Sequence, residues 1–279
     1  SLECGSIGVS AKLPEAIQLA SEFGFESVAV DSGYIAGLPE DKLSELLAEL
    51  KAKRLVWGTA GLPVDFRGSD ENFAKTLKDL PRHAKALNHA GAHRMGTWLS
   101  PSSKTLTYLA NFKQHAARLR EVGKVLADHD VRLGLEYVGP KTSWTNGRYA
   151  FVHTMAEARE LIAAIDQPSV GLLLDSWHWY TAHETEADLL SLKGSDVISC
   201  DLNDAPAGIP IDEQQDLKRD LPCATGVIDL KTFLNALVRI GYDGPIRAEP
   251  FKAELRTLPA KEAVARTAAA MNKAFALIG

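Results

Sequence analysis

The sequence predicts an α/β fold, a single (β/α)8 barrel spanning residues 1–279. Three observations predict it: short apolar runs recur along the chain, segments of helical periodicity separate them, and no Pro- or Ser-rich linker interrupts the series. Alternation of this kind indicates a parallel sheet. Eight units in a chain of 279 residues suit a closed barrel better than an open sheet.

The apolar runs are the predicted strands. They contain too few polar residues to leave one face in water, which is typical of a sheet buried on both sides. They cover residues 6–9, 27–30, 54–58, 93–98, 131–137, 170–175, 196–201 and 245–249.

The segments between the runs are the predicted helices. The first has Pro14 at an early helical position and stops at Gly24. The fifth follows Thr154, which has Glu157 three residues later, the pattern of a capping box. The predicted helices cover residues 14–23, a leucine-rich segment at 43–50, 72–89, 106–128, the segment after Thr154, 184–192, 229–241 and 260–277.

Composition and charge exclude several classes of function. The net charge is −5, which disfavours binding to a nucleic-acid backbone. No apolar run reaches the roughly 18 residues of a membrane-spanning helix. The three cysteines are widely spaced and form no CxxC pair, which suits a reducing compartment. We therefore expect a cytoplasmic protein that binds neither nucleic acid nor membranes.

Four acidic residues end four successive predicted strands: Glu136, Asp175, Asp201 and Glu249. In a barrel the carboxyl ends of the strands meet on one face, where active sites lie. Carboxylates that converge repel one another, so a divalent cation is expected among them. Any one of the four is equally well explained as a helix cap or an ion-pair partner, and Asp204 alone is better read in that way.

Five segments resemble the xylose isomerase-like barrels, a superfamily that includes sugar and sugar-phosphate isomerases and epimerases, inosose dehydratase and endonuclease IV. The segments are GLEYVGP (134–140), LLLDSWHWY (172–180), CDLNDAP (200–206), LKRDLPCATGVIDL (217–230) and GYDGPIRAEPF (241–251). Endonuclease IV has extra histidines after three strands, which this sequence lacks. The resemblance therefore favours the sugar enzymes over a DNA repair enzyme.

The resemblance implies one divalent ion held by Glu136, Asp175, Asp201 and Glu249, with His178 and Arg219 as substrate-binding residues. The family usually has histidine at the third of the ligand positions. Asp201 in its place gives an all-oxygen donor set, which favours Mn²⁺ or Mg²⁺, with Zn²⁺ and Co²⁺ as alternatives.

The function predicted on this basis is a metal-dependent isomerase or epimerase of a ketose, a sugar phosphate or a related polyol. Glu136 and Glu249 would move the proton through an enediolate. Trp98 and Trp177 are the aromatic residues expected to line the sugar pocket. The family resemblance also favours a homo-oligomer. Two alternatives stay open: a metal-dependent dehydratase of the inosose or dehydroshikimate type, and a non-catalytic sugar-binding barrel.

Overall fold

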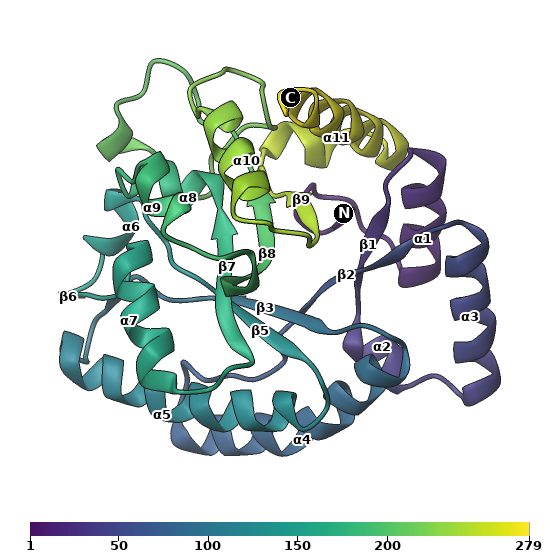
Figure 1. The fold of residues 1–279 in the computed structure, drawn as a ribbon, viewed down its shortest axis with the longest axis horizontal. Helices are drawn as coiled ribbons and strands as arrows, with labels where there is room; N and C mark the ends of the chain where they lie inside the picture. The colour runs from purple at the N-terminus through teal and green to yellow at the C-terminus, as the bar shows by residue number, and fades with distance from the viewer. Residues whose placement is uncertain (279) are drawn as a thin grey trace.

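The computed structural model describes residues 1–278, and its centre is a curled parallel sheet enclosed by helices (Figure 1). The sheet has seven strands in the order β1-β2-β3-β5-β7-β8-β9. Their bounds are β1 (Ser27–Val30), β2 (Val56–Gly61), β3 (Arg94–Trp98), β5 (Arg132–Glu136), β7 (Val170–Asp175), β8 (Val197–Leu202) and β9 (Ile246–Ala248). Every adjacent pair is parallel, as predicted.

The outer layer is formed by helices, of which the first precedes β1 and the others follow the strands in turn. They are α1 (Leu13–Glu22), α3 (Glu40–Ala52), α4 (Asp70–His89), α5 (Tyr108–Ala127), α7 (Met155–Ile165), α9 (Glu186–Leu190), α10 (Leu230–Arg239) and α11 (Ala260–Phe275). The capping box is confirmed, because Thr154 and Glu157 exchange the two expected hydrogen bonds at the start of α7.

Several elements are too short for a periodic pattern to predict. They are the helices α2 (Ser32–Ala36), α6 (Lys141–Trp144) and α8 (Ser176–Thr181), and the antiparallel pair β4 (Ser102–Ser103) and β6 (Tyr149–Ala150). Among the described residues, no helix is both long and apolar enough to cross a membrane.

The predicted strand at residues 6–9 is wrong. This segment forms a turn in which the backbone nitrogen of Gly8 donates to the carbonyl of Gly5, and Gly8 has a φ of 76°. A left-handed residue of this kind breaks an extended strand. The ring is instead closed by residues just before the turn: Leu2 forms a parallel bridge with Val28, and Ser1 donates to the carbonyl of Ile246 in β9 (2.6 Å).

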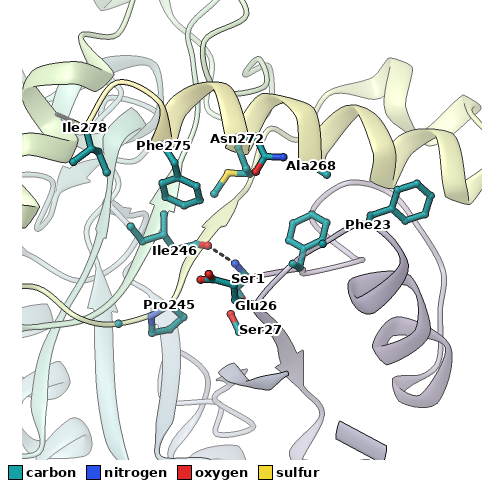
Figure 2. A pocket seen from close by; sticks show the side chains of 14 residues that line it. Ser1, Phe23, Glu26, Ser27, Pro245, Ile246, Ala268, Asn272, Phe275 and Ile278 are labelled. Atoms are coloured by element: carbon teal, nitrogen blue, oxygen red, sulfur yellow. Dashed lines mark hydrogen bonds between the residues drawn. The ribbon is translucent and has the colours of Figure 1, made fainter. Parts of the chain in front are cut away.

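A cavity of about 480 Å³ lies beside this closure, lined by the start of β1, the start of β9 and one face of α11 (Figure 2). Figure 2 shows Ile246 and Phe275 at its apolar wall and the hydrogen bond that joins Ser1 to Ile246. The cavity lies at the amino ends of the strands. It is therefore separate from the face on which the strand-end acidic residues lie.

Inside the barrel, small and large side chains alternate. A Cβ atom on Gly134 would lie 3.1 Å from the side chain of Leu173, so glycine at this position makes room for Leu173. The hydroxyl of Thr59 donates to that of Ser199 across the same interior (2.8 Å). The interior below the site is thus filled by side chains, as in other barrels of this type.

Candidate functional site

The strand register brings the acidic residues to one level of the barrel. Asp175 of β7 lies opposite Asp201 of β8, and Asp201 lies opposite Arg247 of β9. Partners in adjacent parallel strands point to the same face of the sheet, so the three side chains project into the barrel side by side. Glu249, two residues after Arg247, faces the same way because side chains alternate along an extended segment.

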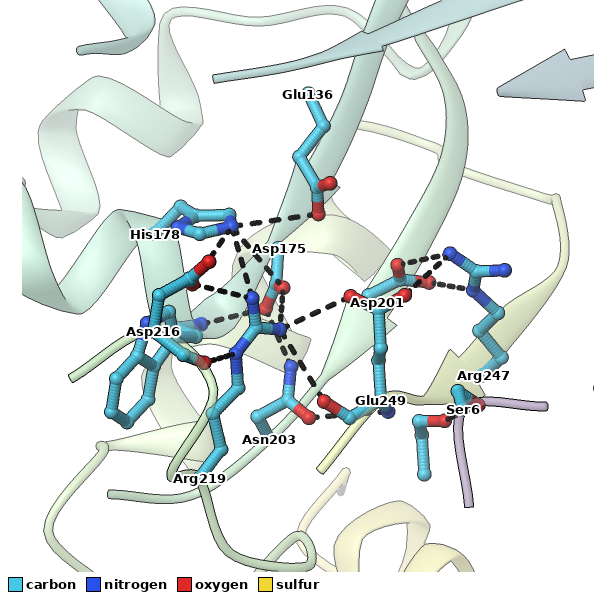
Figure 3. Close-up of polar contacts among 12 residues, drawn as sticks. Ser6, Glu136, Asp175, His178, Asp201, Asn203, Asp216, Arg219, Arg247 and Glu249 are labelled. Atoms are coloured by element: carbon cyan, nitrogen blue, oxygen red, sulfur yellow. Dashed lines mark hydrogen bonds and ion pairs between the residues drawn. The ribbon is translucent and has the colours of Figure 1, made fainter. Parts of the chain in front are cut away.

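The four strand-end carboxylates meet in the structure (Figure 3). Glu136, Asp175, Asp201 and Glu249 each offer an oxygen, and these oxygens all lie within 4.8 Å of one another. The side chains of Asp175 and Asp201 are fully buried, and that of Glu136 is 8% exposed. Acidic groups that are this close together and this well shielded from water repel one another strongly unless positive charge lies among them.

Arg219 supplies part of that charge. Its Nη1 donates to Asp175 Oδ2 (2.8 Å) and to Glu249 Oε2 (3.1 Å), and its Nη2 donates to Asp216 Oδ1 (2.8 Å). The guanidinium also lies over the ring of Phe251, 4.9 Å from its centroid. The loop after β8 therefore delivers a buried cation to the centre of the cluster.

Arg247 supplies a second positive charge, and it pairs chiefly with Asp201. Its Nε and Nη2 donate to the two oxygens of Asp201 (2.6 and 2.8 Å), and Nη2 also donates to Glu249 Oε1 (3.1 Å). This is a bidentate ion pair, the strongest geometry available to arginine and a carboxylate. Among the described residues, Arg247 makes all the hydrogen bonds that the Asp201 carboxylate accepts.

Asn203 links two of the acidic residues. Its Nδ2 donates to Asp175 Oδ1 (2.9 Å), and its Oδ1 accepts from the backbone nitrogen of Glu249 (3.1 Å). Asp204, by contrast, accepts from the backbone nitrogens of Thr225, Gly226 and Ile228 and so fixes the loop before α10. Asp204 thus has a structural role outside the carboxylate cluster, but among the described residues it caps no helix and pairs with no arginine, because α10 is capped by Asp229.

Glu136 is the carboxylate that lacks a partner. Its Oε1 is buried and has no hydrogen-bond partner among the described residues. Burial, and then the charges of Glu249 and Asp175, raise the pKa of Glu136 well above its ordinary value. Burial likewise raises the pKa of Glu249 to about 8, although Arg247 and Arg219 oppose the shift. Both carboxyls therefore hold a proton more readily than exposed glutamates do.

His178 lies in α8 against this cluster. Its Nδ1 accepts from the backbone nitrogen of Gly139 (3.1 Å), while its Nε2 lies 3.7 Å from Glu136 Oε1 and 3.8 Å from Asp175 Oδ2. Burial, and then the charge of Arg219, lower the pKa of His178 to about 3. The ring is thus neutral, and its Nε2 is the atom turned toward the site (Figure 3).

The two tryptophans have different surroundings. Trp177 is fully buried, and the guanidinium of Arg219 lies 5.5 Å from its ring centroid. Trp98 is 49% exposed and lines a cavity of about 300 Å³ together with Glu136, Arg247 and Glu249. This cavity is the entry to the carboxylate cluster, because Glu136 and Glu249 belong to both.

The residues fit one divalent cation. Four carboxylates and Asp216 are present, whereas two guanidiniums pair with them, so negative charge is in excess. The unpaired Glu136 Oε1 is an available ligand atom. An all-oxygen donor set is the one that Mg²⁺ and Mn²⁺ prefer.

Four site residues were missed by the sequence analysis: Arg67, Asn203, Asp216 and Arg247. Arg247 and Asn203 carried a usable signal, because each lies two residues from an acidic candidate and therefore shares its face of the strand. Arg67 carried no usable signal in the sequence, because it follows β2 in an irregular segment whose course no pattern predicts.

Comparison with known proteins agrees with the barrel fold. Residues 17–274 match the family model described as a xylose isomerase-like TIM barrel. A solved xylose isomerase domain protein from Alicyclobacillus acidocaldarius superposes with a TM-score of 0.84 at 31% identity, covering 98% of this chain and 96% of that one.

Two curated relatives are enzymes. The chain is 26% identical to a 3-dehydroshikimate dehydratase of Pseudomonas aeruginosa over 261 residues, which is 92% of this chain and 39% of the relative. It is 30% identical to an inosose isomerase of Bacillus subtilis over 150 residues, which is 52% of this chain and 49% of the relative. The chain thus spans half or less of the length of these relatives.

Proposed function

Because the chain belongs to the xylose isomerase-like TIM barrel family, we propose that it is a metal-dependent isomerase or epimerase of a ketose, a sugar phosphate or a related polyol. One observation carries the proposal: four carboxylates from successive strands of the barrel meet in a buried cluster, and one of them keeps an unpaired oxygen. We also expect the protein to act in the cytoplasm as a homo-oligomer.

In this proposal Glu136, Asp175, Asp201 and Glu249 hold one divalent ion, preferably Mn²⁺ or Mg²⁺, with Zn²⁺ and Co²⁺ as alternatives. When bound, such an ion polarises the carbonyl and the adjacent hydroxyl of a hydroxy-ketone as a Lewis acid.

Glu136 is the base that removes the proton from the carbon beside the carbonyl. Its carboxylate lines the cavity, and its Oε1 accepts no hydrogen bond from the described residues, so one oxygen can hold the ion while the other accepts the proton. The electron pair of the broken C–H bond forms a C=C bond with the carbonyl carbon, and the π pair of the carbonyl moves onto its oxygen, which gives an enediolate. Nε2 of the neutral His178 lies beside Glu136 and is suited to bind a substrate hydroxyl.

Glu249 returns a proton. Its two oxygens accept from Arg219 and Arg247, which fix the carboxylate in place. Return to the opposite face of the same carbon gives an epimer, and return to the former carbonyl carbon gives an isomer.

A dehydratase is the second candidate. The relative whose alignment covers 92% of this chain is a dehydratase, whereas the inosose isomerase match covers 52%. In that reaction the same base removes the proton, and a hydroxyl on the next carbon then leaves as water.

One experiment separates these functions. The protein is incubated with Mn²⁺ and candidate ketoses in D₂O, and proton NMR follows the substrate. Loss of the signal beside the carbonyl, with an unchanged carbon skeleton, supports isomerase or epimerase chemistry. New olefinic signals support the dehydratase. Binding without exchange, unaffected by a chelator, supports the sugar-binding barrel and contradicts our proposal.

A further inference from the structure

Arg67 lies at the entry of the site and is held between two aromatic rings. Its guanidinium carbon is 4.2 Å from the ring centroid of Phe66 and 4.2 Å from that of Trp98. Its Nη2 donates to Thr97 Oγ1 (2.9 Å) and to the carbonyl of Trp98. Arginine stacks readily on aromatic faces. The side chain is therefore fixed before any ligand arrives.

This cation has no acidic partner. Among the described residues, no carboxylate lies within ion-pair distance of Arg67, whereas Arg118, Arg219 and Arg247 each have one. The nearby Asp65 is already engaged, because its oxygens accept from Gly68 and Asn72.

The missing partner matters because Arg67 is partly removed from water. Its Nε is buried without an acceptor, and Nη1 makes no hydrogen bond to the described residues. Burial lowers the pKa of Arg67 to about 10. A desolvated charge without a partner is costly, so a bound anion at this point would relieve the cost.

The location points to the substrate. Arg67 lines the 300 Å³ cavity that also contains Glu136 and Glu249. Trp98, on which Arg67 stacks, is the register partner of Glu136 in the sheet. A volume of this size is at the lower end of small-molecule sites. The other two arginines near the cluster, Arg219 and Arg247, are already paired with carboxylates.

We propose that Arg67 binds an anionic group of the substrate, so that this protein acts on hydroxy-ketones carrying a carboxylate or a phosphate rather than on neutral sugars. This inference rests on the proposed function of the site. Both groups present the oxygens that a guanidinium binds, and the experiment below distinguishes them.

The test is a binding measurement that needs no turnover. Isothermal titration of the Mn²⁺-supplemented protein uses two matched pairs of probes: shikimate with myo-inositol for the carboxylate, and fructose 6-phosphate with fructose for the phosphate. We expect at least one anionic probe to bind about 10- to 100-fold more tightly than its neutral counterpart, the effect of charged hydrogen bonds. The tighter of the two anionic probes identifies the group.

Variants then assign the preference to Arg67. Arg67→Gln should abolish it and leave the neutral probes unchanged, whereas Arg67→Lys should keep part of it. Arg148→Gln is the matched control, because Arg148 is exposed and stacks on one ring, that of Tyr149. Thermal unfolding of each variant checks its folding.

Three results would overturn the inference. The first is that neither anionic probe binds more tightly than its neutral counterpart, which includes no binding at all. The second is that Arg67→Gln weakens the binding of charged and neutral probes equally, and the third is that this variant keeps the wild-type preference for the anionic probe. Its failure is distinguishable from failure of the proposed function. Solvent exchange with neutral ketoses and no anion preference would refute the inference alone. Anion binding that depends on Arg67, without exchange in any substrate, would refute the function alone.

Discussion

Replacing Arg247 with methionine tests whether an ion pair is what keeps the Asp201 carboxylate stable in the barrel. Asp201 is fully buried, and both of its oxygens accept from Arg247. Methionine fills part of the volume of arginine but carries no charge and donates no hydrogen bond. The variant therefore leaves a buried carboxylate without its partner.

The size of the effect follows from the burial. Removal of one member of a buried ion pair costs about 3–5 kcal/mol, whereas replacement of both members by apolar residues is often neutral. The Arg247 side chain is 17% exposed, so solvent screens the pair only weakly. We expect Arg247→Met to lose about 3–5 kcal/mol, a large share of the typical 5–15 kcal/mol of a folded protein. Adding Asp201→Leu should restore most of it.

The assay is urea unfolding at neutral pH in the presence of EDTA, which removes any contribution from a metal ion. Arg239→Met is the matched control, because Arg239 forms an exposed pair with Glu186 and should change stability by less than about 0.5 kcal/mol. Two results would refute the reasoning. One is a loss of unfolding free energy below about 1 kcal/mol in Arg247→Met. The other is a double variant, Arg247→Met with Asp201→Leu, whose loss equals the sum of the losses in the two single variants.

Three further predictions concern the site and the core. Glu136→Gln and Glu249→Gln should each lower solvent exchange into substrate by about 10²–10⁴-fold while Mn²⁺ binding persists in calorimetry; exchange at the wild-type rate would exclude the two-glutamate mechanism. His178→Ala should raise the substrate Kd and leave Mn²⁺ affinity unchanged, and the reverse pattern would count against its role in substrate binding. Burial lowers the pKa of His115 to about 4, so the unfolded chain takes up a proton between about pH 6.5 and 4 that the folded protein does not. The free energy of unfolding of the wild type, measured with urea, should therefore fall by up to about 3 kcal/mol more across this window than that of His115→Phe. Equal losses in the two proteins would contradict the lowered pKa of His115.

The fold could be predicted closely from the sequence. Apolar runs and helical periodicity are local properties, and seven of the eight predicted strands lie near their predicted places. The failure at residues 6–9 has a local cause too, since the Ser-Ile-Gly-Val run is apolar enough for a strand but includes Gly8 in a left-handed turn. Leu2 and its neighbours close the ring instead.

The candidate site could be predicted in part. Acidic residues at strand ends must approach one another in any closed parallel barrel, and the structure does bring Glu136, Asp175, Asp201 and Glu249 together. Their state of pairing was not predictable. Nothing near Asp201 in the sequence indicates that Arg247, 46 residues later, would take both of its oxygens.

The sequence by itself determined which acidic and basic side chains are present and at which ends of the strands they lie. This was possible because the alternation of apolar and polar segments and the length of each strand are local properties of the sequence. Only the tertiary structure decided which charges meet. The register of β7, β8 and β9 aligns Asp175, Asp201 and Arg247, and an irregular segment after β2 brings Arg67 between Phe66 and Trp98. Electrostatic pairing depends on distance in space, and the folded barrel fixes that distance between residues far apart in the chain.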